Sequence, residues 1–472
     1  MSLLIGCNGG GWNNSVSNLF YGSKWDLSQK DPVGERIGSK DLAKLMPVHS
    51  RMYRYVLTED GTKIKCHPND SRKREDGTPL PLNCTLGNVF LNVPSCYFML
   101  KIVGTTLYAA VSDYPVSEDF KPVSFDDITP FRACVNRTNS SKLKAACGSF
   151  LRWNGDDILR DENGYPVYTD NAASFRGGNN ASANDGTYKS FLGMATTATS
   201  LAQWRGYCNN AGQNIHAGSW RSYQFIAWLH RIEFNNLNCQ ATYTTELDAD
   251  GLPQGGTGAG VSLNGTDWNT HNGYYPLVPE GVTAPLGNNT GRLTYTIKNF
   301  MNSGTDKDVN VFSYRGLENP YEYLYLLFDD VRIWHDSPDV ENPESYVYVG
   351  TDPSTFASPS SVTDKTVLPG YELLTAGVPR ANGYISSMSV DSEKCMGFPT
   401  EVNVDAGASY KLCDYFYQNI GSESYGWFML LGAGNASDGS YAGFGATDTR
   451  NRCSSTSAAY AVLLCHQKNA AS

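Results

Sequence analysis

Two adjacent carboxylate pairs, Asp156-Asp157 and Asp329-Asp330, are the first residues of this sequence whose types and spacing could do chemistry. Glycoside hydrolysis uses two carboxyl groups placed on either side of a sugar. Neighbouring residues of a strand, however, point their side chains in opposite directions. Acidic turns are also common, and the sequence contains no G-x-S-x-G nucleophile motif. These pairs therefore favour a structural role over catalysis.

The histidines and cysteines do not have the spacing of metal ligands. No two of the seven histidines stand at i,i+4, and none of the twelve cysteines forms a C-x-x-C pair. Several cysteines lie within apolar runs, which favours free buried thiols over disulfides. His230 is expected to be solvated or hydrogen-bonded rather than a ligand. The sequence thus predicts no metal, no cofactor and no catalytic residue.

The segment from Gly432 to Ser457 is the best candidate for a binding surface. It consists almost entirely of Gly, Ala, Ser, Asn, Asp and Thr, with few large side chains, and it lies between two apolar runs. Loops on a rigid scaffold are where binding residues concentrate, although an ordinary Gly/Ser loop remains the alternative. Aromatic rings offer stacking area, and the polar side chains offer hydrogen bonds. The candidate ligand-binding residues are Trp427, Asn435, Ser437, Asp438, Ser440, Tyr441, Phe444, Asp448, Arg450, Asn451 and Arg452.

An amphipathic helix within Gly218 to Gln240 is expected to organise the C-terminal half that carries this segment. Phe225, Leu229 and Ile232 fall on one stripe at 100° per residue. Gln224, His230 and Arg231 fall away from the stripe. Ser219 or Ser222 is placed to cap the first turn.

Strands with period-two patterns dominate the rest of the chain. The runs Met52 to Leu57 and Thr62 to Cys66 flank a Glu-Asp-Gly turn, which predicts a hairpin. A second pair of strands meets at Gly104-Thr105, and the apolar run before Cys465 predicts a buried terminal strand. We divide the chain into an N-terminal arm (1–45), a small antiparallel β region (46–160) and a ligand-binding domain (161–472).

The composition narrows the classes of partner. The net charge of −10 argues against nucleic-acid binding, which needs clustered Lys and Arg. No apolar run reaches the roughly 18 residues that a membrane span needs. The first residues lack the positive region of a secretory signal, so we expect synthesis in a cytoplasm without export by that route.

Four stretches, at 48–80, 218–240, 311–334 and 427–464, resemble those of a known family, and the strongest motif is SYRGLENP at Ser313 to Pro320. The family comprises phage fibre and adhesin proteins that end in a C-type-lectin fold of the formylglycine-generating-enzyme type. Some of its members are variable proteins of diversity-generating retroelements in phages of gut Bacteroidetes. The family motif usually continues with Trp-Gly-Asn, whereas here Tyr321-Glu322-Tyr323 follow.

This resemblance implies an α+β fold for the third region. A C-type-lectin-like domain, with a twisted antiparallel sheet, two flanking helices and long loops, would follow the small β-rich N-terminal region. The resemblance also implies that the penultimate segment presents the ligand-binding face. In the retroelement class such positions are diversified from adenine-containing codons, and Asn435 and Asn451 are of the residue type from which that process starts.

The resulting expectation is a non-enzymatic virion protein, a tail or head fibre component, that binds a host-surface glycan or protein through its C-terminal face. It would be a homo-oligomer, with a trimer favoured, and its arm would contact other virion proteins. One alternative is a structural virion protein that makes only protein contacts. Another is an enzyme on the same fold, a depolymerase or an oxidase, although Cys453 and Cys465 are too far apart for the close cysteine pair of the copper enzymes.

Overall fold

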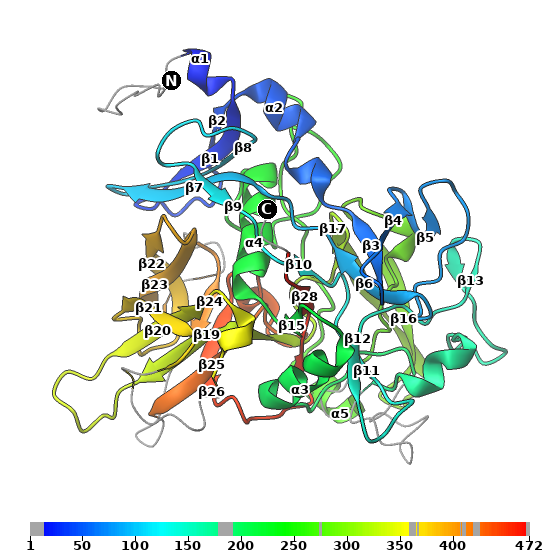
Figure 1. The fold of residues 1–472 in the computed structure, drawn as a ribbon. Coiled ribbons are helices and arrows are strands. Elements are labelled where there is room, and N and C mark those ends of the chain that lie inside the picture. The colour runs from blue at the N-terminus through cyan, green and yellow to red at the C-terminus, as the bar shows by residue number, and fades with distance from the viewer. Residues whose placement is uncertain are drawn as a thin grey trace.

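The computed structural model describes residues 14–177, 192–272, 276–357, 365, 368–405, 407, 412–418 and 425–468 (Figure 1). The protein is mostly β, with 39% strand and 14% helix, and one of its sheets forms half a barrel. The predicted α+β class, a lectin-like domain with two helices flanking a twisted sheet, is therefore wrong. Short period-two runs outnumber helical ones, and only α3 (Leu201–Ala211) and α4 (Trp220–Phe234) exceed eight residues among the described helices.

The strands of the described residues form three large sheets and three small ones. In hydrogen-bonding order, the five-stranded sheet contains β2 (Glu35–Gly38), β1 (Phe20–Asp26), β8 (Thr106–Ser112), β7 (Cys96–Val103) and β9 (Lys121–Val123). The seven-stranded sheet contains β15 (Ile215–Ala217), β28 (Leu464–His466), β10 (Asp127–Ile128), β6 (Gly87–Leu91), β3 (Arg54–Thr58), β4 (Lys63–His67) and β5 (Asp70–Arg74). Chain segments more than 300 residues apart thus share one sheet, because β28 lies beside β10.

The largest sheet carries the C-terminal part of the chain. Its order is β21 (Tyr371–Ala376), β20 (Ser345–Gly350), β19 (Tyr325–His335), β25 (Gly426–Gly432), β26 (Thr447–Asn451), β24 (Tyr415–Tyr417), β22 (Gly383–Asp391) and β23 (Met396–Asn403), with β27 (Tyr460–Ala461) also pairing with β19. The small sheets contain β11 (Cys134–Asn136) with β12 (Lys144–Ala146), β13 (Trp153–Asn154) with β14 (Asp157–Ile158), and β16 (Gly291–Phe300), β17 (Thr305–Tyr314) and β18 (Leu317–Glu318). The remaining α-helices are α1 (Asn14–Ser17), α2 (Lys40–Leu45) and α5 (Gly265–Asn272).

Helix α4 runs through the middle of the molecule, where all three large sheets meet (Figure 1). It packs against β1 and β8 of the five-stranded sheet, β10 of the seven-stranded sheet and β19 of the largest sheet. All of its fifteen residues except Arg221 are buried. The predicted helix is confirmed, but the expected polar face is not exposed, because protein surrounds the helix on every side.

Three polar side chains of α4 have hydrogen-bond partners inside the protein. The amide of Gln224 donates to the carbonyl oxygen of Phe444 (2.8 Å), and Arg231 donates to the Asp414 carboxylate (2.7 Å). The Nε2 atom of His230 lies 3.2 Å from Oγ1 of Thr257, which confirms the expected hydrogen-bonded histidine. Such hydrogen bonds offset the free-energy cost of burying these polar groups.

The beginning of α4 is fixed by two residues. Ser219 is the N-cap, as predicted, and its hydroxyl accepts a hydrogen bond from the Ser222 amide at 3.2 Å. Gly218 before it has φ +28°, and a Cβ atom there would lie 2.0 Å from the Leu327 carbonyl oxygen. A glycine is therefore required for the close approach between the start of the helix and β19.

Several local predictions are confirmed. The hairpin of β3 and β4 turns at Gly61 with φ +84°, and the strands β7 and β8 pair along their length. The terminal apolar run forms the buried strands β27 and β28. Residues 14–45 supply β1, β2 and α2, and the core cluster around α4 extends from Tyr21 to Cys465. The division of the chain into an arm and two further regions stays a prediction.

Candidate functional site

The predicted binding segment, Gly432 to Ser457, connects two strands of the largest sheet. It leaves β25, passes the 3₁₀-helix η7 (Gly439–Tyr441), and enters β26, which lies between β25 and β24. This path brings η7 next to β24 and β22. The segment is therefore held on a sheet on both sides, as a binding loop on a rigid scaffold requires.

Four tyrosines gather beside this segment, and we call Tyr384, Tyr415, Tyr417 and Tyr441 the tyrosine patch. The ring centroids of Tyr415 and Tyr441 are 4.4 Å apart, and those of Tyr415 and Tyr417 are 4.5 Å apart. Tyr384 pairs directly across the strands with Tyr415, at a centroid distance of 5.1 Å. Tyr441 is 42% exposed, Tyr415 and Tyr417 are half-buried, and Tyr384 forms the buried base. The patch offers adjoining aromatic surface with polar hydroxyl groups.

The local sequence explains why β24 presents two rings on one face. Tyr415 and Tyr417 are two residues apart, so their side chains lie on the same side of the strand. Phe416 between them points into the core and is 1% exposed. The tyrosines of β24 and β22 were missed by the sequence analysis, although the alternation in Asp414 to Gln418 was a usable signal.

A guanidinium group lies at the rim of the patch. Arg450 donates from Nε and Nη2 to the two oxygens of Asp448, at 3.0 and 2.6 Å. Its charged carbon lies 4.8 Å from the centroid of the Tyr417 ring. Asn451 also donates to Asp448, at 3.4 Å. The carboxylate thus holds a flat, partly exposed guanidinium next to the aromatic surface, which is a fixed geometry for hydrogen bonds to a ligand.

The loop before η7 is held by its own polar groups. The Asn435 side-chain oxygen accepts from the amide and hydroxyl of Ser437, both at 2.7 Å, and Asp438 accepts from the Asn435 amide at 2.9 Å. Burial raises the pKa of Asp438, and the negative charge of Asp448 adds to the rise. Ser440 lies 3.1 Å from the Tyr384 hydroxyl, so the loop is joined to the base of the patch.

Three further predicted site residues lie elsewhere. Phe444 is fully buried, with ring centroids of Tyr321 and Tyr223 5.4 and 5.5 Å away. Trp427 is buried against Trp334 and Tyr348. Arg452 lies over the Phe428 ring and donates to the Tyr425 carbonyl. The structure therefore brings Ser440, Tyr441, Asp448, Arg450 and Asn451 to the patch, with Asn435, Ser437 and Asp438 supporting its loop.

The carboxylate pairs have structural partners. Asp329 is held between Arg205 and Arg332, and Asp330 accepts from the Ser219 hydroxyl and the Trp220 amide at the start of α4. Asp156 pairs with Arg72 at the surface. These contacts are those of a folded framework rather than of two facing carboxyl groups.

Thiols and histidines also have structural surroundings. The eleven described cysteines are thiols, and nine of them are buried, as predicted. Burial lowers the pKa of His49 and His335 to about 4 each, and their rings bond to neighbouring hydroxyl and carbonyl groups. Among the residues with a described placement, no three His, Cys, Asp or Glu side chains are arranged to hold a metal ion. In the same residues, no helix is both long and apolar enough to cross a membrane.

A buried carboxyl group, Glu280, gives the fold a pH dependence. It accepts a hydrogen bond from the Arg132 amide at 3.0 Å. Burial, together with the negative charge of nearby Glu318, raises its pKa to about 8, and the Arg132 charge offsets this rise only in part. A carboxyl group that binds a proton more tightly when folded loses stability as pH rises, here between about 4.5 and 8. We expect the free energy of unfolding to fall by about 1 kcal/mol more between pH 6 and pH 7 in the native chain than in Glu280→Gln.

Urea titrations at the two pH values measure this difference. Glu246→Gln, at an exposed carboxyl group, is the control and should keep the native slope. Equal slopes in the native chain and Glu280→Gln would contradict a raised pKa at Glu280.

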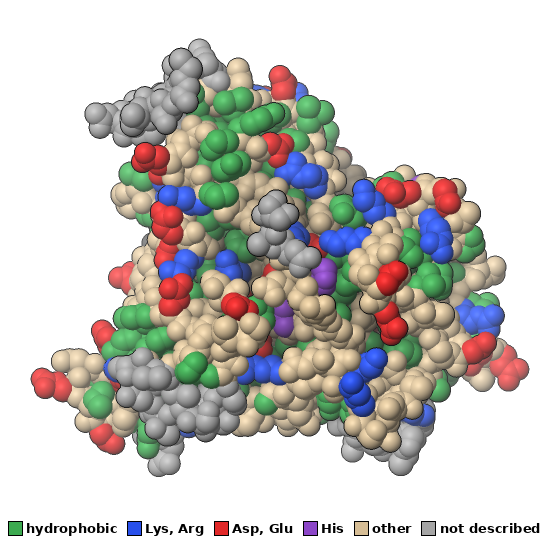
Figure 2. Space-filling model, viewed as in Figure 1, with side chains coloured by type: hydrophobic (Ala, Val, Ile, Leu, Met, Phe, Trp, Pro, Cys, Tyr) green, Lys and Arg blue, Asp and Glu red, His purple; other side chains and the backbone are tan. Residues whose placement is uncertain are grey.

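Basic and acidic side chains are interspersed over the face shown in Figure 2. The chain as a whole has a net charge of −10. Comparison with known proteins adds no family to these observations. The chain matches no protein-family model, and no curated protein matches its sequence.

Proposed function

We propose that this protein is a non-enzymatic, fibre-type component of a phage particle that binds a host-surface glycan or protein at the tyrosine patch. The observation that carries the binding role is the gathering of four tyrosines from three chain segments at one surface beside the Arg450–Asp448 pair. The phage assignment rests on the resemblance of the four sequence stretches and not on the fold. The virion is accordingly its proposed location.

The patch suits a sugar or an aromatic-rich protein surface. Tyrosine rings give rigid contact area at low cost in side-chain entropy. Tyr and Arg also dominate the energetically important positions of protein interfaces. The hydroxyl groups of Ser440 and the tyrosines, with the guanidinium of Arg450, supply donors and acceptors around the rings.

The proposal includes assembly into a homo-oligomer, with a trimer favoured, and contacts to other virion proteins through the N-terminal arm. A shallow surface patch binds weakly by itself. Presenting several copies on one particle raises the effective affinity without any new contact.

Binding of the purified full-length chain to candidate host cells tests the proposed function. We expect the Tyr441→Ala, Arg450→Ala double variant to bind at least about tenfold more weakly than the native chain, because an aromatic and a guanidinium anchor are both removed. Tyr165→Ala is the matched control, since Tyr165 is 45% exposed and lies far from the patch in the chain. Flow cytometry of cells with the labelled protein measures the difference.

Two outcomes would contradict the proposal. If the double variant binds as well as the native chain, the receptor contact lies elsewhere on the protein. If the native chain binds no candidate host, a structural virion role becomes the better explanation.

A further inference from the structure

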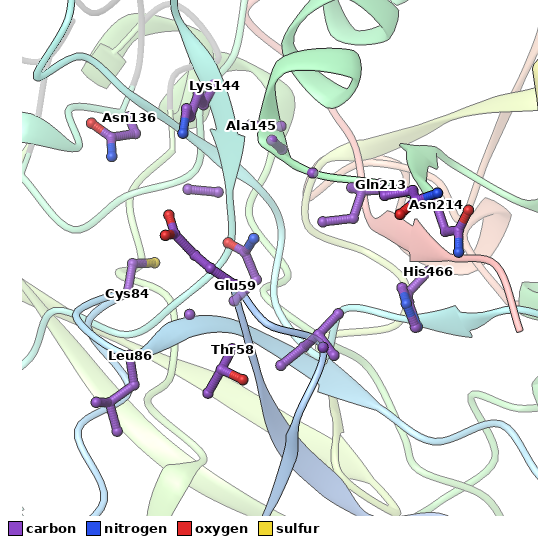
Figure 3. A pocket seen from close by; sticks show the side chains of 18 of the residues that line it. Thr58, Glu59, Cys84, Leu86, Asn136, Lys144, Ala145, Gln213, Asn214 and His466 are labelled. Carbon is purple, nitrogen blue, oxygen red and sulfur yellow. The ribbon is translucent and has the colours of Figure 1, made fainter.

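A pocket of about 900 Å³ (Figure 3) is lined by none of the residues of the tyrosine patch. Its walls are the turn of the β3–β4 hairpin, the start of β6, the strand β12 and the segment that follows α3. The C-terminal residues His466 and Lys468 close one end. A pocket of this volume is large enough for a ligand of several residues.

Two strand edges face each other across this pocket. At one end they are joined, because the Val89 amide donates to the Cys147 carbonyl at 3.0 Å and the Cys147 amide donates to the Asn88 side chain at 2.9 Å. Toward lower residue numbers the strands separate, and the pocket lies between Gly87 of β6 and Ala145 of β12. The seven-stranded sheet leaves this part of β6 open, since β6 pairs with β10 only at Leu91.

Backbone amide and carbonyl groups of successive residues point to alternate sides of a strand, and this shows which of them face the pocket. The amide of Val89 faces β12 rather than β3, so the amide and carbonyl of Gly87, two residues earlier, face the same way. The same argument applies to Ala145, two residues before Cys147. Both edges therefore direct a backbone donor and a backbone acceptor into the pocket. Unpaired strand edges are templates for pairing with another strand.

The side chains of the pocket are mostly polar. Glu59 extends from the hairpin turn into the pocket, and Lys144 lies on the wall formed by β12 (Figure 3). Neither side chain has an ion-pair partner in the described structure. Phe175 is the one Phe, Tyr or Trp side chain lining the pocket in that structure, and it is itself buried. The pocket thus lacks the exposed ring on which a sugar stacks, and it combines free strand edges with charges of both signs. Glu59, Asp60 and Lys144 line it, together with Lys63 and Lys468, which both bond to Asp127.

We propose that this pocket binds an extended polypeptide segment of a partner protein, which inserts as a strand between the edges of β6 and β12. Main-chain hydrogen bonds to Gly87 and Ala145 supply the affinity, as in other complexes formed by strand addition. A basic side chain of the segment faces Glu59 and an acidic one faces Lys144. The segment is mostly polar, because polar side chains outnumber apolar ones in the lining of the pocket.

A library of acetylated and amidated octapeptides, varied position by position, tests the proposal with the full-length protein. We expect the library to select peptides with a basic and an acidic position. N-methylation of the best peptide, one amide at a time, should weaken binding about tenfold at alternate positions and hardly at all at the positions between them. This period of two arises only if the peptide pairs as a strand.

Variants of the protein provide the second arm of the experiment. Ala145→Pro removes the amide that faces the pocket and should weaken peptide binding about tenfold, whereas Ala145→Gly keeps the amide and should bind like the native chain. Glu59→Lys should reverse the preference for a basic position. Far-UV circular dichroism and thermal melting establish that each variant is folded.

Three results would overturn the proposal. The first is that the native chain binds no peptide of the library, the second is that the N-methyl series shows no alternation, and the third is that a glycan or a second copy of this chain displaces the selected peptide from the pocket. Because all three concern a pocket that is lined by no residue of the tyrosine patch, they leave the cell-binding experiment unaffected.

Discussion

Asp329→Ala is expected to lower the free energy of unfolding by about 3–5 kcal/mol, because it leaves a buried guanidinium without its counter-charge. The Asp329 side chain is 4% exposed and bonds to Arg332, whose side chain is fully buried, and to Nε of Arg205 at 2.7 and 2.9 Å. Removing one partner of a buried ion pair lowers the free energy of unfolding by much more than the intact pair adds to it. Urea unfolding at pH 7, followed by tyrosine and tryptophan fluorescence, measures the loss.

The other predicted carboxylate pair supplies a matched control. Asp156 also bonds to an arginine, Arg72, but its side chain is 89% exposed. Exposed ion pairs contribute about 0–1 kcal/mol, so Asp156→Ala should change the stability little. Equal losses in the two variants would show that burial is not what makes the Asp329 group important.

The pH dependence of the Asp329 group gives an independent check. Burial alone raises the pKa of Asp329, but the charges of Arg332 and Arg205 outweigh burial and hold the pKa below its ordinary value. A depressed folded-state pKa contributes stability above the unfolded pKa, and that stability is lost as pH falls through the folded value. Asp329→Ala should therefore lose less stability than the native chain on acidification below about pH 4.

Local elements of the fold could be predicted because their signals are local. The hairpin at Gly61 needs only a period-two pattern and a residue that accepts positive φ. The cap at Ser219 needs only a hydroxyl before an apolar stripe. Such rules give the element and its approximate bounds without any knowledge of the neighbouring strands.

The arrangement of these elements could not be predicted, because it depends on contacts between distant segments. Nothing in the sequence of β28 says that it lies between β10 and β15, or that β26 lies between β25 and β24. Nor does the pattern of α4 say that its polar side chains have buried partners at Thr257, Asp414 and Phe444. The amphipathic pattern correctly predicted a helix, but the accompanying expectation that one face of the helix is exposed to water was wrong.

The candidate site shows the same division. Composition identified the segment of Tyr441, Asp448 and Arg450 as a candidate surface, but the expectation that a run without aliphatic side chains cannot form a core was wrong, since Ala433 and Phe444 of the same segment belong to the core around α4. The three other tyrosines of the patch come from β22 and β24, which meet η7 only through sheet pairing and loop packing. The sequence of a Gly-rich segment also does not show which of its aromatic side chains are exposed. In the structure Tyr441 is exposed and Phe444 is buried.

Phe444→Ala is the second substitution for which a large loss is expected, about 3–5 kcal/mol in the free energy of unfolding. The Phe444 ring is fully buried among Tyr223, Tyr314, Tyr321 and His230, with centroid distances of 5.2–6.1 Å. Truncation removes apolar contact with all four rings and leaves a cavity that a rigid sheet and a central helix cannot close. Chemical denaturation measures the loss, and Phe444→Leu, which keeps most of the volume, should lose less.

Comparison with Tyr441→Ala separates the role of Phe444 from a role in ligand binding. Tyr441 lies three residues away on the exposed side and is expected to cost under about 1 kcal/mol in stability when truncated, while it weakens cell binding. Phe444→Leu should keep the native affinity for cells, because its side chain does not reach the surface. A Phe444→Leu variant that is as stable as the native chain but no longer binds would place this ring in the receptor site. The two aromatic residues of one glycine-rich segment would then share a function that their opposite burial argues against.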